Sequence, residues 1–247
     1  MQGEKRHLKY DVASGPVLAI FLIHLYVNYN FQEIKPPILK FKMILEEIKS
    51  LLATEAEAIK NIPVNDEFGK ALDIIHEQVH QKKGKLITSG MGKAGQIAIN
   101  MATTFSSTGT PAVFLHPSEA QHGDLGVIQE NDVMLLISNS GKTREIIELV
   151  ELARGLRPHV RFIVITSIKE SLLAEAAEAT LHTGNPQEVC ALGLTPTTST
   201  TTMTVIGDIL VVLLMKRIGF TNHDYSLRHH GGYLGDKSRK AASLDKK

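Results

Sequence analysis

The sequence predicts an α/β protein with a doubly wound parallel sheet, and two observations indicate it. Residues 132–137 and 161–165 each contain a short, continuous apolar run after one charged residue, a pattern typical of strands covered on both faces of a parallel sheet. Residues 146–152 follow the first run and repeat their apolar side chains at helical spacing. Strand–helix alternation of this kind builds a parallel sheet that binds ligands beyond the carboxyl ends of its strands.

The same patterns assign the remaining elements in chain order. Helices are predicted at about residues 41–59, 64–80, 93–107, 146–152, 172–177 and 200–218, and strands at 86–88, 112–115, 132–137, 161–165 and 179–181. The last helix is apolar between Met203 and Leu214 apart from Asp208. A charged residue inside the apolar stretch favours a buried or subunit-interface helix over a membrane span.

Composition narrows the class of protein. The 247 residues, 43% of them hydrophobic, suffice for one large domain with appendages. A formal net charge of +1 gives no sign of a nucleic-acid partner. The single cysteine, Cys190, cannot form an intrachain disulfide, which suits a reducing compartment. Its neighbours Val189 and Ala191 predict a small buried thiol rather than a nucleophile.

Three parts of the chain differ in character. We interpret residues 1–37 as an N-terminal appendage that ends at a Pro-Pro pair. Its apolar run, residues 16–27, is shorter than the ~20 residues that span a bilayer, and no small-residue cleavage site follows it. Residues 38–235 form the main domain, and residues 236–247 form a basic C-terminal tail.

The turn between the buried strand and the helix at 146–152 is the most informative segment. It carries the hydroxyls of Ser138, Ser140 and Thr143 together with Gly141, directly before a helix N-terminus. Unpaired backbone N–H groups and the positive end of the helix dipole attract an anion there. These residues predict a phosphate site with the carboxylate of Glu145 beside it. Helix capping alone is the alternative interpretation.

A second glycine-rich turn follows the strand at 86–88. Residues 90–95 fit the G-x-G-x-x-G pattern of dinucleotide sites, so nicotinamide-type cofactor binding is a rival interpretation. The acidic ribose ligand expected about 20 residues later is missing, since His116 and Pro117 stand at the end of the next strand. We therefore interpret Lys93 as a cation for a sugar phosphate or an oxyanion.

Two histidine-containing segments remain. His122 lies in a loop with Asp124, and the spacing of these residues fits no common metal-binding motif. Two roles remain for His122: proton transfer, or simply holding the turn. His229 lies in a glycine-rich stretch near the C-terminus. The hydroxyl run at 195–202 enters the last predicted helix, and such runs usually cap helices.

Together these segments resemble a known family. From about residue 38 to 235 the chain is similar to sugar isomerase (SIS) domains, and closely to the D-arabinose 5-phosphate isomerases, in a form without CBS regulatory domains. The matching segments are residues 90–93, 106–111, 122–126, 138–141, 192–201 and 229–235. The resemblance implies a five-stranded, flavodoxin-like parallel sheet flanked by helices and a cytoplasmic homotetramer. It also implies interconversion of D-ribulose 5-phosphate and D-arabinose 5-phosphate, the first step of Kdo synthesis for lipopolysaccharide or capsule.

The family's functional positions carry over residue by residue. The catalytic positions fall on Lys93, His122, Glu145 and His229, and the phosphate-binding positions fall on Ser89, Ser138, Ser140 and Thr143. Four positions depart from the family pattern: Ala94 replaces a usual serine, Lys142 a frequent glutamate, Arg228 a small residue and His230 a proline. These departures concern substrate choice rather than the class of reaction.

An aldose–ketose isomerase moves a proton between C1 and C2 through a cis-enediol. The reaction needs a base over the carbon, an electrophile for the oxyanion and a phosphate anchor. We expect Glu145 to be the base, Lys93 the electrophile, and His122 and His229 the proton shuttles. The choice of carbon base among Glu145 and the two histidines stays open. Neither a metal nor another cofactor is required.

Two further expectations concern ligands and partners. A non-catalytic SIS regulator that binds a phosphosugar is the alternative function, since it would keep the hydroxyl turn but would not need Glu145 and the two histidines. A downstream Kdo-type sugar is expected to compete with the substrate, because Arg228 and His230 add cationic partners for a larger anion. No nucleic-acid or membrane partner is expected.

Overall fold

The computed structural model describes residues 41–244, so the predicted appendage at 1–37 and its apolar run lie outside the described residues. The chain divides into two compact units, residues 1–53 and 54–247. A helix covers residues 41–60, as predicted, and crosses the boundary between the units. The candidate site lies in the second unit.

The second unit is built on a five-stranded sheet in which every neighbouring pair is parallel. The strands are β1 (Leu86–Gly90), β2 (Ala112–Phe114), β3 (Val133–Ile137), β4 (Arg161–Thr166) and β5 (Ala179–His182). Their order across the sheet is β2-β1-β3-β4-β5. The predicted fold class is confirmed, and all five predicted strands are present.

Alternation along β3 divides the apolar side chains between two cores. Val133, Leu135 and Ile137 pack on one face of the sheet, while Met134 and Leu136 pack on the other. All five are fully buried, which explains why the strand is a continuous apolar run rather than an alternating one. Burying a leucine-sized side chain stabilises a fold by roughly 1.5–3 kcal/mol, so this strand is a principal source of stability.

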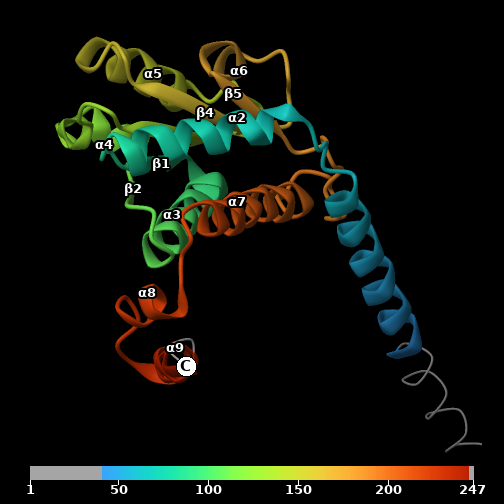
Figure 1. The fold of residues 1–247 in the computed structure, drawn as a ribbon. Helices are drawn as coiled ribbons and strands as arrows, with labels where there is room; N and C mark the ends of the chain where they lie inside the picture. The colour runs from blue at the N-terminus through green and yellow to red at the C-terminus, as the bar shows by residue number, and fades with distance from the viewer. Residues whose placement is uncertain (1–40, 245–247) are drawn as a thin grey trace, which may run out of the picture. The chain divides into compact units, whose positions relative to one another are not determined.

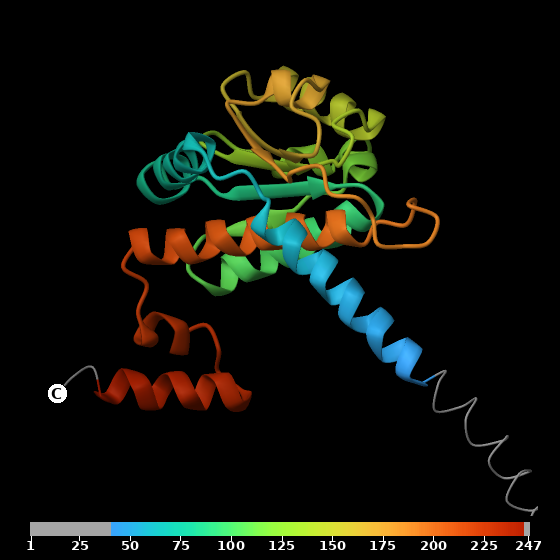
Figure 2. The same ribbon diagram turned by 90° about the vertical axis from the view of Figure 1, so that its right-hand side faces the viewer.

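Helices cover both faces of the sheet (Figures 1 and 2). The helices of the first face are α2 (Asp66–Ile75), its π-helical continuation η2 (His76–Gln81), α3 (Gly92–Ser107) and α7 (Thr198–Arg217). Those of the second face are α4 (Pro117–Ala120), α5 (Arg144–Leu156) and α6 (Leu172–Ala176). Figure 2 shows α3 and α7 below the sheet and α5 and α6 above it.

The chain after α7 forms two further helices that were not predicted. These are α8 (Asn222–Ser226) and α9 (Gly232–Leu244), which pack against each other (Figure 1). A capping box formed by Thr221 and Asp224 starts α8. Residues 236–244, interpreted from the sequence as a tail, belong to the same helix as residues 232–235. Also unpredicted are α4 and a short 3₁₀ turn, η3 (Asp124–Val127).

Within the described residues, α7 is the one helix long and apolar enough to cross a membrane. Half of that stretch is buried inside the fold, and core helices pass the same test of length and composition. Its inner face packs closely on α3, where Gly207 leaves room for the side chain of Met101. This packing supports the predicted buried role for one side of α7.

Candidate active site

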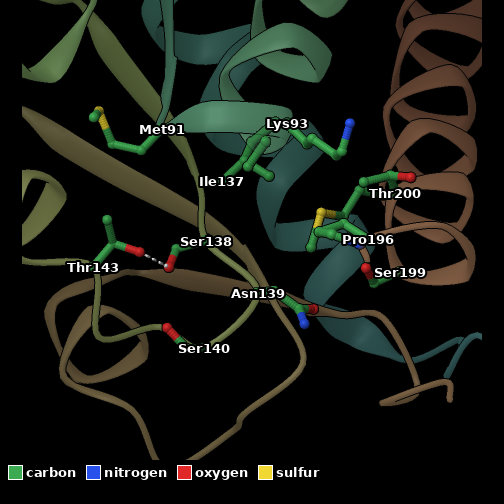
Figure 3. A pocket seen from close by; sticks show the side chains of 12 residues that line it. Met91, Lys93, Ile137, Ser138, Asn139, Ser140, Thr143, Pro196, Ser199 and Thr200 are labelled. Carbon is green, nitrogen blue, oxygen red and sulfur yellow. Dashed lines mark hydrogen bonds between the residues drawn. The ribbon is translucent and has the colours of Figure 1, made fainter. Parts of the chain in front are cut away.

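A pocket of about 260 Å³ lies at the carboxyl ends of β1 and β3 (Figure 3). It occupies the point where the strand order reverses, because β1 leads to β2 on one side and β3 leads to β4 on the other. Its lining residues are Met91, Lys93, Ala94, Ile137, Ser138, Asn139, Ser140, Thr143, Pro196, Ser199, Thr200 and Met203. We refer to it as the central pocket. Three helices, α3, α5 and α7, begin beside it.

The first wall of the central pocket is the loop of residues 138–143, between β3 and α5. Ser138 is buried, and its Oγ lies 2.8 Å from Thr143 Oγ1, where either hydroxyl can donate. Ser140 is exposed, and its Oγ accepts a bond from the Lys142 amide at 3.2 Å. Thr143 is the N-cap of α5 but makes no side-chain capping bond, so the capping interpretation of this turn is wrong. The loop therefore presents hydroxyls and an uncapped helix N-terminus to the pocket.

Gly141 permits the tight turn of this loop. Its φ of +60° is in the left-handed region, and a Cβ at this position would lie 2.1 Å from Ser171 Oγ. Any side chain here would therefore meet both backbone strain and a direct overlap. The glycine holds the 138–143 loop against the residues that follow β4.

The second wall is the start of α3. Here Gly95 approaches β1 so closely that a Cβ would lie 2.7 Å from the Gly90 carbonyl oxygen. Lys93, in the first turn of the helix, is exposed and lines the pocket. Among residues 41–244 the Lys93 ammonium has no hydrogen-bond or ion-pair partner. Figure 3 shows its Nζ extending toward Thr200 of α7. An unpaired cation thus stands between the first and third walls.

The third wall is the start of α7, which the sequence did not assign to the site. Pro196, Ser199, Thr200 and Met203 of this wall line the pocket. Glu188, from the loop between β5 and α7, accepts hydrogen bonds from the first residues of the helix. In the sequence, the only sign of this wall was the hydroxyl run at 195–202, which helix capping was sufficient to explain. No local spacing of residues connects that run to Glu188.

Four of the eight predicted site residues line the central pocket: Lys93, Ser138, Ser140 and Thr143. The other four lie outside its lining. Ser89 is fully buried in β1 and donates its hydroxyl to the Leu115 carbonyl at 2.6 Å. Glu145 is half-buried in the first turn of α5, directly after the loop.

The two predicted histidines lie apart from the pocket lining. His122 is exposed in the turn after α4. His229 lies between α8 and α9, with its ring stacked on that of Tyr225 at a centroid distance of 3.8 Å. Its Nδ1 is 3.1 Å from the Tyr225 carbonyl oxygen.

Two other side-chain features bear on the predictions. No group of three His, Cys, Asp or Glu side chains within residues 41–244 is placed to hold a metal ion. Cys190 is half-buried in the loop before α7, so the predicted buried thiol is wrong. Its Sγ accepts the amides of Leu194 and Thr195 at 3.3 and 3.1 Å. The Thr195 amide is the main cause that lowers the pKa of Cys190 to about 7.

The fold and the pocket together define a class of protein. The five-stranded parallel sheet with a pocket at its switch point is typical of the SIS architecture, and the SIS domain model matches residues 79–213. This chain belongs to the SIS domain family.

Individual relatives narrow the comparison. The chain is 44% identical over 191 residues to arabinose 5-phosphate isomerase KdsD of Yersinia pestis, an alignment that covers 76% of this chain and 56% of that protein. It is 46% identical over 191 residues to KdsD of Escherichia coli K12, with the same coverage. The chain thus spans about half the length of the curated relatives it matches.

Solved structures match over nearly their whole length. A Bacteroides fragilis protein, described as a phosphosugar isomerase involved in capsule formation, is 66% identical, with a TM-score of 0.76 and coverage of 77% of this chain and 99% of that one. The c3406 protein of Escherichia coli CFT073, in complex with arabinose 5-phosphate, is 33% identical, with a TM-score of 0.71 and coverage of 76% and 98%.

Proposed function

We propose that this chain is an arabinose 5-phosphate isomerase, which interconverts D-ribulose 5-phosphate and D-arabinose 5-phosphate through a cis-enediol. The observation that carries the proposal is the central pocket, where an unpaired Lys93 faces the hydroxyl loop and the uncapped N-terminus of α5. The KdsD relatives and the arabinose 5-phosphate complex of the c3406 protein supply the substrate.

The phosphate would bind at the 138–143 loop. Backbone N–H groups at the start of α5 have no side-chain acceptor, so they and the helix dipole favour an anion there. Hydroxyls of Ser138, Ser140 and Thr143 add neutral donors around it. Ser89 supports the end of β1 through its bond to Leu115, so its contribution to phosphate binding would be indirect.

Binding the phosphate at one wall leaves the sugar chain within reach of Lys93. Its ammonium would polarise the carbonyl and stabilise the enediolate, because an unpaired cation in a partly enclosed pocket acts strongly on developing negative charge. Glu145, which follows the loop, would take the carbon-bound proton. His122 and His229 would move protons between the oxygens and open the sugar ring.

The proposal includes a homotetramer in the cytoplasm, serving Kdo synthesis. Support for assembly comes from α7, whose apolar stretch from Met203 to Leu214 is interrupted only by Asp208, although only half of the helix window is buried. A helix of that kind is normally covered all round. Val212 and Leu213 are 49% and 36% exposed. Neighbouring copies would cover this side and would bring His122 and His229 to the pocket.

Regulation by product is a further part of the proposal. A nucleotide-activated Kdo-type sugar would compete with the substrate for the hydroxyl loop and for Lys93. Arg228 lines a separate groove beside α3 and β2 and lies over the Phe220 ring at 5.2 Å. Competitive inhibition in steady-state kinetics is expected. Since Arg228 does not line the central pocket, Arg228→Ser tests separately whether the larger sugar extends to this groove. Absence of inhibition at millimolar concentrations would contradict this part alone.

A direct assay tests the central claim. The purified chain is incubated with D-ribulose 5-phosphate, and the pentose phosphates are resolved by chromatography. We expect arabinose 5-phosphate to form, and we expect no reaction with unphosphorylated D-ribulose. A non-catalytic phosphosugar regulator would bind the substrate without converting it.

A matched pair of variants controls the assay. Lys93→Met removes the cation from the pocket and should lower kcat by ~10²-fold or more, the scale of one lost oxyanion partner. Lys142→Met removes an exposed cation whose side chain does not line the pocket, so turnover should stay near the parent value. Equal turnover in both variants would reject Lys93 as the electrophile.

A further inference from the structure

The 138–143 loop is held in place by residues 166 and 167, at the end of β4. The carbonyl oxygen of Asn139 accepts three hydrogen bonds from them: from Ser167 Oγ at 2.7 Å, from the Ser167 amide at 3.0 Å and from Thr166 Oγ1 at 3.1 Å. Thr166 and Ser167 are both buried. Since a carbonyl oxygen has two lone pairs, these donors occupy its whole accepting capacity. The Asn139 carbonyl is therefore fixed toward the end of β4.

This contact determines the direction of the next backbone donor in the loop. In a planar trans peptide the carbonyl of one residue and the N–H of the next point in opposite directions. With the Asn139 carbonyl bonded to the end of β4, the Ser140 N–H points away from it. Ser140 lines the central pocket, and its amide donates to no acceptor within residues 41–244. Figure 3 shows Ser140 beside Ser138 and Thr143 on this wall. A free backbone donor is thus available to an anion there.

The same three bonds strengthen that donor. Hydrogen bonds in a chain polarise one another, because each bond accepted by a carbonyl draws electron density away from the N–H of the same peptide. The Asn139 carbonyl and the Ser140 N–H belong to one peptide. The Ser140 N–H therefore carries more positive charge than an amide whose carbonyl faces water, and it binds an anion more strongly.

His182, at the end of β5, holds Ser167 in turn. Its Nδ1 is 3.0 Å from the Gly184 amide nitrogen, and its Nε2 is 2.7 Å from the Ser167 carbonyl oxygen. Because an amide N–H only donates and a carbonyl only accepts, Nδ1 is the acceptor and the ring proton is on Nε2. His182 thus donates to Ser167. The Ser167 backbone is fixed between β5 on one side and the Asn139 carbonyl on the other.

We propose that Ser167 and His182 are positioning residues that aim the Ser140 N–H at the phosphate group of the ligand. This proposal rests on the proposed function for placing the phosphate at the 138–143 loop. Ser167 acts through the Asn139 carbonyl, and His182 acts through Ser167. Neither residue lines the central pocket. Together they set the affinity for phosphate and leave the contacts to the sugar chain unchanged.

Two ligands that cannot isomerise test this by calorimetry. D-Arabinitol 5-phosphate keeps the sugar hydroxyls and the phosphate but has no carbonyl, and inorganic phosphate has no sugar at all. Ser167→Ala removes the hydroxyl bond to the Asn139 carbonyl and leaves the bond from the Ser167 amide in place. We expect both affinities to fall by the same factor, about 3- to 10-fold, the scale of one hydrogen bond.

Ser238→Ala is the matched control. Ser238 is also a buried serine whose hydroxyl donates to a backbone carbonyl, that of Gly235, but it lies in α9 and does not line the central pocket. This variant should bind both ligands like the parent. Thermal unfolding of each variant confirms that it is folded.

A pair of His182 variants separates the two bonds of the ring. In His182→Asn the carboxamide oxygen replaces Nδ1 and can still accept the Gly184 amide, but the side chain is too short to reach Ser167. In His182→Gln the longer side chain brings an amide nitrogen to the place of Nε2. We expect His182→Asn to lose affinity for both ligands and His182→Gln to keep it. The ³¹P resonance of bound arabinitol 5-phosphate should move in His182→Asn and Ser167→Ala but not in His182→Gln.

Each outcome decides the proposal. Equal loss of the two ligands in Ser167→Ala and His182→Asn, with rescue in His182→Gln, supports it. Three results would overturn it: unchanged binding in Ser167→Ala, the same loss in both His182 variants, or a loss confined to arabinitol 5-phosphate, which would place the effect on the sugar chain. Because neither ligand requires turnover, a failure to convert ribulose 5-phosphate would reject the proposed function separately.

Discussion

Ser138 Oγ and Thr143 Oγ1 lie 2.8 Å apart, and this bond joins the end of β3 to the start of α5. It fixes the width of the loop in which a phosphate would sit. Since only one of the two hydroxyl protons makes the bond between them, the other can turn toward an anion while that bond stays in place.

The first prediction concerns that pair. Ser138→Ala should weaken phosphosugar binding by about 1–3 kcal/mol, because a charge-assisted hydrogen bond to phosphate is lost together with the bond to Thr143. Thr103→Ala is the control, since this exposed hydroxyl of α3 only donates to its own helix. Isothermal titration with arabinitol 5-phosphate measures the difference. Unchanged affinity in Ser138→Ala would place the phosphate elsewhere.

The second prediction concerns the carbon base. Glu145→Gln keeps the shape of the side chain in the first turn of α5 but removes its basicity. We expect kcat to fall by at least ~10²-fold with little change in substrate binding, the usual scale for a positioned acid or base. Steady-state kinetics with ribulose 5-phosphate decides the point. Near-normal turnover would shift the role of base to one of the two histidines.

A pair of glycine variants tests the geometry of the loop. Gly141→Ala should lower the free energy of unfolding by more than ~1–2 kcal/mol, the cost of the left-handed backbone alone, because its methyl group also overlaps Ser171. Gly69→Ala is the contrast, since Gly69 lies in α2 with nothing near its Cβ position. That change should stabilise the protein by roughly 0.5–1 kcal/mol. Urea denaturation measures the free energy of unfolding of both variants. Similar changes in Gly141→Ala and Gly69→Ala would contradict the described geometry of the loop.

The last prediction is a dependence of stability on pH. His80 is half-buried in η2 with its Nε2 3.1 Å from Thr110 Oγ1. Burial is the main cause that lowers the pKa of His80, and the neighbouring His76 and Lys83 lower it further. Above the unfolded pKa of about 6.5 the imidazole is neutral in both states, so it does not affect the balance. As the pH falls below that value, the unfolded chain binds the proton first and stability decreases.

Replacing His80 isolates this effect. In His80→Gln the amide can still reach Thr110 but does not titrate, so the fall in stability between about pH 7 and pH 5 should become shallower. Denaturant unfolding across that range provides the measurement. His223→Gln is the control, because His223 is an exposed residue of α8. Parallel pH profiles for the parent and His80→Gln would show that His80 does not couple folding to protonation.

Much of the fold could be predicted because its signals are local. The buried run Val133–Ile137 is recognisable from its composition, and helical spacing marks α5 and most of α3. The short helices α4 and α8 and the C-terminal α9 were missed, since they are brief or follow glycine-rich segments. Their formation depends on capping and on the packing of α8 against α9 rather than on a strong apolar period.

The candidate site divides in the same way. The hydroxyl loop at residues 138–143 and the cation Lys93 could be predicted from local patterns, because each directly follows a strand that ends at the switch point of the sheet. The third wall could not be predicted in this way, since packing places the N-terminus of α7 at the pocket and Glu188 beside it. The carboxylate and Ser199 belong to different segments, and their bond exists because the loop after β5 folds back over the start of α7. Contacts of this kind depend on how elements pack, and the spacing of residues along a chain does not encode them.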